Sequence, residues 1–293
     1  MKNFLKTIFF YGLVIFAALN LISFLSLYSL RNSCFYKPEF LQNGVSETQF
    51  DYLVLGSSTG LMTLNTIQID SITHKKGLNI SLDDSSLSSH YLMLQHFYQL
   101  NKKTKTLILA VIPWDCGDKN PKINENDYRF LPYINQEYIY NYYVALQKSK
   151  INVLALTKYF PIIGVSYYNA ELFFPSLLAF VSPEKRNKFD QKGNFSYPNL
   201  GSPTNTKQSD LNLVFNNPYV KKIASFCKTN KIELIIYQSP LYKTNVLQTN
   251  TNFEFINHSN LIKSANYFYD DIHVNEKGRK LCSSLVAQYL KTQ

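Results

Sequence analysis

Two short polar stretches, far apart in the sequence, carry the side chains best suited to nucleophilic chemistry. The first is Gly56-Ser57-Ser58, which follows an apolar run; the second lies near the C-terminus and contains Asp270 and His273. A serine hydroxyl becomes a nucleophile when an imidazole removes its proton and a carboxylate orients that imidazole. The three-residue spacing of Asp270 and His273 on a turn lets the carboxylate contact one ring nitrogen while the other faces a hydroxyl.

Each stretch also has a simpler structural explanation. Gly-Ser-Ser after a strand is typical of a turn and a helix N-cap. Near the C-terminus, Asp270 and Asp271 favour the positive end of a following helix, for which Asn275 is a suitable N-cap. Either stretch alone is better explained as a helix start. Together, at opposite ends of one α/β pattern, they form a Ser…Asp-x-x-His arrangement.

The elements that must position these residues alternate between strands and helices. Strands are predicted over 51–56, 77–82, 106–113, 232–240 and 266–270, and helices over 60–70, 86–100, 217–229 and 276–290. The strands are apolar nearly throughout, as in a parallel sheet covered on both faces, and the alternation is typical of α/β proteins. Loops after the carboxyl ends of such strands hold the site, so both polar stretches are expected at that edge.

The α/β pattern lapses between about residues 115 and 215, which we interpret as an insertion after the third strand. Helices are predicted over 136–147 and 152–160, an aromatic buried helix or lid over 167–180, and irregular structure over 189–208. Tyr167, Tyr168, Phe173 and Phe174 could line a glycan or acyl groove, although core packing explains them more simply. We therefore predict one three-layer α/β domain over 51–293, with this insertion.

The first fifty residues differ from the rest. Residues 7–30 form a run of 24 without a charge, and a helix of that length crosses the roughly 30 Å hydrocarbon core of a bilayer. Asn20, Ser23, Ser26 and Ser29 make a faint polar stripe in this run, which is either tolerated in lipid or pairs with another helix.

The alternative explanation of this run is a cleavable signal peptide. The run is longer than the apolar core of such peptides, and no A-x-A site follows it. We therefore predict an uncleaved anchor over 1–30 and a polar stalk over 31–50. Lys2 and Lys6 before the run favour a cytoplasmic N-terminus, with the body outside the inner membrane.

Composition excludes several function classes. With 293 residues, of which 45% are hydrophobic and 15% aromatic, the chain can bury a core and is not disordered. Its net charge of +10 comes from scattered basic residues, which argues against nucleic-acid binding; an anionic lipid surface, an acidic polymer or plain solvation explains it as well. The sequence has no H-E-x-x-H, C-x-x-C or P-loop motif, so we expect no metal and no cofactor.

The Ser…Asp-x-x-His arrangement over about residues 51–290 resembles the SGNH (GDSL-like) hydrolase superfamily. The sequence looks most like membrane-anchored members of the DltD and AlgJ/AlgX type, which modify cell-surface polymers and also have one N-terminal anchor and a GSS-type first block. The resemblance implies that Ser58 is the nucleophile, His273 the general base and Asp270 the acid that orients it.

The other family blocks are altered here. Where the family has a glycine whose N–H enters the oxyanion hole, this sequence has Asp83 or Asp84, and where it has an asparagine, this sequence has Trp114 and Asp115. The resemblance thus implies oxyanion donors at Ser58, Asp84 and Asp115. The loss of one such donor typically costs about 3–4 kcal/mol of transition-state stabilisation.

Two functions follow from this resemblance. The first is a serine esterase or O-acyltransferase that acts on acyl esters of a cell-surface glycan or polymer, with an acylated polysaccharide and a membrane-embedded acyltransferase as expected partners. The second is a catalytically degenerate module of the same fold that binds polymer or scaffolds a membrane complex. The altered blocks favour the second function, and the intact Ser58, Asp270 and His273 favour the first.

Overall fold

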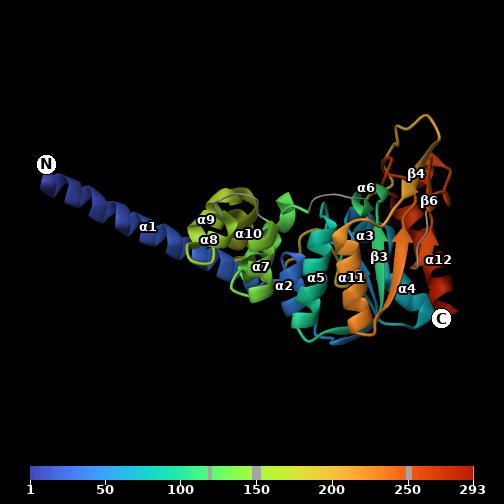
Figure 1. Cartoon of the computed structure of the whole chain (residues 1–293), viewed down its shortest axis with the longest axis horizontal. Helices are drawn as coiled ribbons and strands as arrows, with labels where there is room; N and C mark the ends of the chain where they lie inside the picture. The colour runs from blue at the N-terminus through green and yellow to red at the C-terminus, as the bar shows by residue number, and fades with distance from the viewer. Residues whose placement is uncertain (118–120, 147–152, 249–252, 293) are drawn as a thin grey trace. The chain divides into compact units, whose positions relative to one another are not determined.

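The computed structural model describes the chain except for residues 118–120, 147–152, 249–252 and 293 (Figure 1). These residues divide into two compact units. Unit 1 comprises Met1–Val45 and Glu125–Asn187, and unit 2 comprises Ser46–Asn124 and Lys188–Gln293. Much of the expected insertion therefore groups with the N-terminal helix and not with the α/β unit.

Unit 2 is built on a five-stranded parallel sheet with the strand order β2-β1-β3-β5-β7. Its strands are β1 (Gln49–Leu55), β2 (Gly77–Asn79), β3 (Lys103–Val111), β5 (Glu233–Gln238) and β7 (Glu254–Asn257). A separate parallel pair consists of β4 (Ser209–Leu213) and β6 (Thr244–Gln248). The predicted fold class, α/β with a parallel sheet flanked by helices and one apolar N-terminal helix, is confirmed.

Helices cover both faces of this sheet. They are α3 (Ser58–Thr63), α4 (Thr66–Thr73), α5 (Leu87–Gln99), α11 (Pro218–Thr229) and α12 (Glu276–Lys291), with short turns α6 (Pro113–Cys116) and η2 (Ala265–Tyr267). Because alternate strand residues point to opposite faces, Val54, Ile108 and Ile235 share one face and pack with Val286 of α12. Figure 1 shows α5 and α11 side by side over the face turned to the viewer.

Two predicted elements of unit 2 differ in the structure. The expected strand over 266–270 is the 3₁₀ turn η2 followed by a single bridge between Phe268 and Val274. In the run of aromatic residues 267–269, Phe268 is fully buried in the core while its neighbours are partly exposed. The expected helix over 60–70 is divided at Leu64, whose backbone is extended, and Asn65 caps α4 by accepting a hydrogen bond from the N–H of Ile67.

Unit 1 is helical. It contains α1 (Lys2–Arg31), α2 (Lys37–Asn43), the 3₁₀ segment η1 (Glu125–Tyr133), α7 (Glu137–Leu146), α8 (Val153–Leu156), α9 (Pro161–Tyr167) and α10 (Asn169–Val181). By length and composition, α1 could cross a membrane. The predicted stalk over 31–50 is wrong in its central part, because α2 is folded into unit 1 with Phe40 and Leu41 fully buried.

The polar stripe of α1 faces other helices of the same unit. Ser23 and Ser26 are buried, and the Ser29 hydroxyl donates a hydrogen bond to the Ser176 carbonyl of α10 at 2.8 Å. The Asn20 amide oxygen accepts from the N–H of Ile162 in α9 at 3.4 Å. The helix-pairing interpretation of this stripe is therefore correct, and the partner is the chain's own insertion.

Candidate active site

The Gly56-Ser57-Ser58 turn is fixed by close packing against the neighbouring strand. A Cβ atom added to Gly56 would lie 2.7 Å from the Ala110 carbonyl oxygen of β3. One added to Gly60, in the following helix α3, would lie 2.7 Å from the Ser81 hydroxyl and 3.0 Å from the Ala110 side chain. The absence of side chains at these two positions lets α3 start directly at the carboxyl end of β1.

This turn separates the two serines. Ser57 is the N-cap residue of α3; its side chain is buried and its hydroxyl lies 3.4 Å from that of Thr59. Ser58 is the first residue of α3, and it is more exposed than Ser57. Its N–H lies in the first helical turn, where backbone donors have no acceptor within the helix. Of the two serines, only Ser58 presents its hydroxyl to the opposite turn.

That opposite turn precedes α12 and carries Asp270 and His273. One Asp270 carboxylate oxygen accepts hydrogen bonds from the N–H groups of Ile272 and His273, at 2.9 and 2.8 Å. Asn275 caps α12 through its side-chain oxygen, as predicted. These local bonds hold the Asp270 carboxylate in place before it makes any contact with the imidazole.

Ser58, His273 and Asp270 lie in one hydrogen-bonded line. The Ser58 Oγ atom is 2.8 Å from His273 Nε2, and His273 Nδ1 is 2.8 Å from Asp270 Oδ2 and 3.0 Å from Oδ1. The imidazole is nearly buried, while the Asp270 side chain is 42% exposed. With Nδ1–H directed at the carboxylate, Nε2 is free to accept the serine proton, which is the arrangement that activates a serine nucleophile.

Two tyrosines support the imidazole, and no sequence pattern pointed to either of them. The Tyr197 ring lies edge-on to His273, with ring centroids 5.4 Å apart, and stacks on Tyr269 at 4.0 Å. Gly201 allows this packing, because a Cβ atom there would lie 2.1 Å from the Tyr269 backbone. Burial raises the pKa of the Tyr197 phenol, so this ring is neutral beside the histidine.

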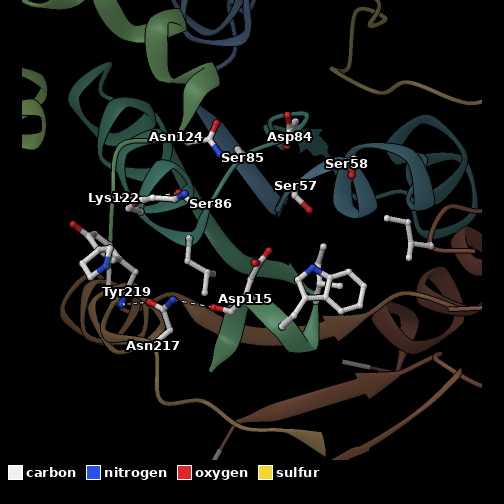
Figure 2. A pocket seen from close by; sticks show the side chains of 16 residues that line it. Ser57, Ser58, Asp84, Ser85, Ser86, Asp115, Lys122, Asn124, Asn217 and Tyr219 are labelled. Atoms are coloured by element: carbon white, nitrogen blue, oxygen red, sulfur yellow. Dashed lines mark hydrogen bonds between the residues drawn. The ribbon is translucent and has the colours of Figure 1, made fainter. Parts of the chain in front are cut away.

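A pocket of about 350 Å³ opens beside Ser58 (Figure 2). Its lining is rich in hydroxyl groups, namely Ser85 and Ser86 from the loop after β2 and Ser88 from the first turn of α5. Trp114 from the loop after β3 is 42% exposed and adds an apolar plane. The pocket also includes residues that the sequence did not single out: Lys122, Asn124, Asn217, Tyr219 and Ile272.

The three residues expected to donate to an oxyanion differ in the position and availability of their backbone N–H groups. The Ser58 N–H at the start of α3 is well placed beside the nucleophile. Asp84 lines the pocket with a left-handed backbone, φ 44°, the conformation that glycine adopts most readily. Asp83 is not among the lining residues.

The backbone N–H of Asp115 is not available to an oxyanion. Its N–H already donates to the Ile112 carbonyl at 3.0 Å, within the short α6 turn. Its own carbonyl accepts a hydrogen bond from the Asn217 side chain at 2.8 Å, drawn as a dashed line in Figure 2. What Asp115 contributes to the pocket is a carboxylate side chain.

The described part of the chain contains no cluster of metal-binding side chains and no exposed thiol. Among those residues, no three His, Cys, Asp or Glu side chains gather closely enough to hold a metal ion. The four cysteines lie in the described part of the chain, are buried and form no disulfide there. Burial raises the pKa of Cys227 and of Cys282 to about 12, so both thiols stay protonated in the core.

Comparison with known proteins adds no assignment: no family model and no curated protein matches this sequence. The geometry of the site therefore carries the functional argument by itself.

Proposed function

We propose that this protein is a membrane-anchored serine esterase or O-acyltransferase of the SGNH type, acting on acyl esters of a cell-surface glycan or polymer. The observation that carries the proposal is the hydrogen-bonded line of Ser58, His273 and Asp270, at 2.8 Å for each link. More than two hundred residues separate the serine from the histidine. One ring nitrogen of His273 contacts the Ser58 hydroxyl and the other contacts the Asp270 carboxylate, which is the geometry that acyl transfer needs.

In the proposed reaction the Ser58 oxygen attacks the acyl carbonyl while His273 Nε2 takes the hydroxyl proton. Asp270 stabilises the imidazolium, and the oxyanion accepts from the Ser58 and Asp84 N–H groups. Nε2 then gives its proton to the leaving alkoxide as the ester C–O bond breaks. Water or a sugar hydroxyl next gives a proton to His273 and takes the acyl group from Ser58. The imidazolium returns that proton to the Ser58 oxygen as its bond to the acyl carbon breaks, which completes hydrolysis or transfer.

The pocket supports a sugar-linked acyl ester as substrate. Serine hydroxyls and the exposed indole of Trp114 line it, and Asn124 adds an amide. A few polar groups around an apolar surface are what orients a small ligand. The pocket volume of about 350 Å³ suits a short acyl group and one sugar ring.

The proposed location is the outer side of the cytoplasmic membrane, held by an uncleaved α1. The hydrogen bond from Ser29 to Ser176 and the burial of Ser23 and Ser26 support the uncleaved form, because cleavage would remove part of a packed unit. Lys2 and Lys6 support a cytoplasmic N-terminus.

The test uses the full chain in detergent micelles, with Ser58→Ala and Ser57→Ala as a matched pair. Each is incubated with a fluorophosphonate probe, which labels activated serines, and with p-nitrophenyl acetate. We expect the wild type and Ser57→Ala to react, and Ser58→Ala to lose labelling and to hydrolyse the ester at least about 10³-fold more slowly. Equal labelling of Ser58→Ala and the wild type would show that another group is the nucleophile.

One observation favours the alternative, a degenerate module that binds polymer. Asp84 and Asp115 both contribute side chains to the pocket lining, and a carboxylate directed at a developing oxyanion would oppose it. The same experiment separates the two functions. A folded wild type that neither takes the probe nor hydrolyses the ester is the result expected of the degenerate module.

A further inference from the structure

The C-terminal half of α1 is packed against α9 and α10, as Figure 1 shows. The Phe16 ring lies 5.7 Å from that of Phe160, directly before α9. Farther along, Asn20 is bonded to Ile162, and Ser29 is bonded to Ser176 in the middle of α10. The inserted helices therefore accompany α1 from Phe16 to nearly its end.

The thickness of a bilayer decides whether these contacts lie inside it. A helix rises about 1.5 Å per residue, so a hydrocarbon core of roughly 30 Å takes about twenty residues. Counted from Lys6, the core extends to about Ser26; counted from Lys2, it extends to about Ile22. In both cases it includes the part of α1 between Phe16 and Ile22, where α9 begins. Insertion of α1 therefore brings the start of α9 into the same leaflet.

The outer surface of α10 is apolar. After Glu171 this helix has no charged residue. Its large exposed side chains are Phe174, Leu177, Leu178, Phe180 and Val181. On α1, Leu21, Ile22, Phe24 and Leu25 are exposed as well. Contiguous apolar surface of this kind is rare on proteins in water and marks contact with a membrane or with another protein.

A groove of about 620 Å³ within unit 1 shares the exposed Leu21 and Phe24 of α1 with this surface. Leu21, Phe24 and Leu27 of α1 line its apolar part. Arg31 and Lys158 also line it, and the lining contains no carboxylate. Counted from Lys6, Arg31 lies five residues beyond the end of the core at Ser26, a rise of about 8 Å, which is the level of the lipid head groups. A phospholipid has this pattern, with an acyl chain at depth and an anionic head group at the interface.

The backbone of α10 is also suited to lipid. Pro175 lies inside α10 and has no N–H, so it cannot make the usual helical hydrogen bond to the Glu171 carbonyl four residues earlier. The Tyr36 hydroxyl donates to that carbonyl at 2.6 Å. Unpaired backbone groups are costly in hydrocarbon, and kinked helices enter it only when neighbours satisfy the freed group.

From these observations we infer that α9 and α10 are embedded beside α1 in one leaflet, and that phospholipid acyl chains cover their apolar face and fill the groove. The chain thus has a second membrane contact besides its anchor. This inference does not depend on the proposed chemistry at Ser58.

The chain's single tryptophan makes a direct depth measurement possible. In a Trp114→Phe background, one tryptophan is introduced into the full chain as Leu178→Trp or Phe180→Trp, both on α10. Leu21→Trp on α1 is the lipid-exposed reference. Leu200→Trp in unit 2 is the water-exposed control, matched to Phe180 because their exposed fractions are 87% and 82%. Each variant is reconstituted into phosphatidylcholine vesicles with or without bromine on the acyl chains, which quenches nearby indoles.

We expect the emission of both α10 variants to be blue-shifted and to be quenched in brominated vesicles, less strongly than that of Leu21→Trp because α10 lies beside Ser29 at the edge of the core, while Leu200→Trp is unaffected. Circular dichroism of each variant checks that the helices form. Folded α10 variants whose emission matches that of Leu200→Trp would overturn the inference. In that case a protein, absent from these vesicles, would be the partner of this surface.

Discussion

The two units of the molecule place apolar residues in opposite ways. In unit 2, Leu53, Leu107 and Ile236 lie in the sheet without measurable exposure. In unit 1, Phe174 and Phe180 of α10 point outward, as does most of α1. The hydrophobic effect rewards removal of such side chains from water, by burial inside the protein or by transfer into lipid. Unit 2 uses the first route, and under the proposed membrane insertion unit 1 uses the second.

Polar residues within apolar runs also differ between the units. In unit 1, Asn20 and Ser29 lie in the uncharged run of α1 and bond the backbone of α9 and α10. In unit 2, Ser58 follows an apolar strand and its hydroxyl meets His273. A polar side chain next to an apolar run thus joins helices in one unit and forms the candidate site in the other. What it contacts, and not its sequence context, separates the two roles.

The largest effect is expected at Asp270. Asp270→Asn keeps the size of the side chain but removes the charge that stabilises the imidazolium, so the rate of p-nitrophenyl acetate hydrolysis should fall roughly 10³-fold. Asp271→Asn is the matched control, because the Asp271 carboxylate instead accepts hydrogen bonds from Thr204 and Asn205. Its rate should equal that of the wild type. Similar losses in both variants would mean that the turn as a whole, and not the line through His273, controls the rate.

Much of unit 2 could be predicted because its signals are local. Apolar runs such as 106–113 identify buried strands, and the carboxyl ends of parallel strands meet at one edge. Ser58, Asp270 and His273 could thus be placed near one another. The strand expected over 266–270 was wrong because a run of aromatic residues also occurs where one ring, that of Phe268, anchors a turn in the core.

Other features depend on contacts that no local pattern contains. Tyr197 supports His273 across 76 positions of the sequence, and its surroundings are simply irregular. The left-handed backbone of Asp84 is set by the path of its loop, since aspartate does not require that conformation. In unit 1 the polar stripe of α1 was visible, but its partner on α9 and α10 lies more than a hundred residues away.

The next largest effect is a loss of stability when alanine replaces a closely packed glycine, compared with a glycine that has open space around it. Gly56→Ala places a methyl group 2.7 Å from the Ala110 carbonyl, and overpacking of this kind costs about 1–3 kcal/mol of unfolding free energy. Gly12→Ala in α1 meets nothing within 4 Å and is the control. Trp114, the only tryptophan, lies in unit 2, so its fluorescence during urea titration reports this unit alone. Equal midpoints for Gly56→Ala and wild type would contradict the tight approach of β1 to β3.

Buried titratable groups give the two units opposite responses to pH. Burial raises the pKa of Glu39 in unit 1 well above its usual value, so the folded form binds a proton more readily than the unfolded one. Stability from this group is present at low pH and is lost as the pH rises through the raised pKa. All five histidines lie in unit 2. Burial lowers the pKa of His258 to about 4 and that of His90 to about 3.

The smallest expected effect is a change in how steeply the unfolding free energy of unit 2 falls with decreasing pH. Because the folded pKa of His258 lies below the unfolded value of 6.5, the unfolded chain binds more protons as the pH falls below 6.5. Each buried histidine then removes up to about 1.4 kcal/mol of stability per pH unit, and for His258 this continues until about pH 4. His258→Gln keeps a polar group near the Tyr237 hydroxyl, which lies 3.1 Å from the His258 ring. Urea titrations followed by Trp114 fluorescence should show a shallower loss for this variant between pH 6.5 and 4, and no change in slope between pH 7 and 8. Identical slopes in the acid range would mean that His258 is protonated in the folded unit.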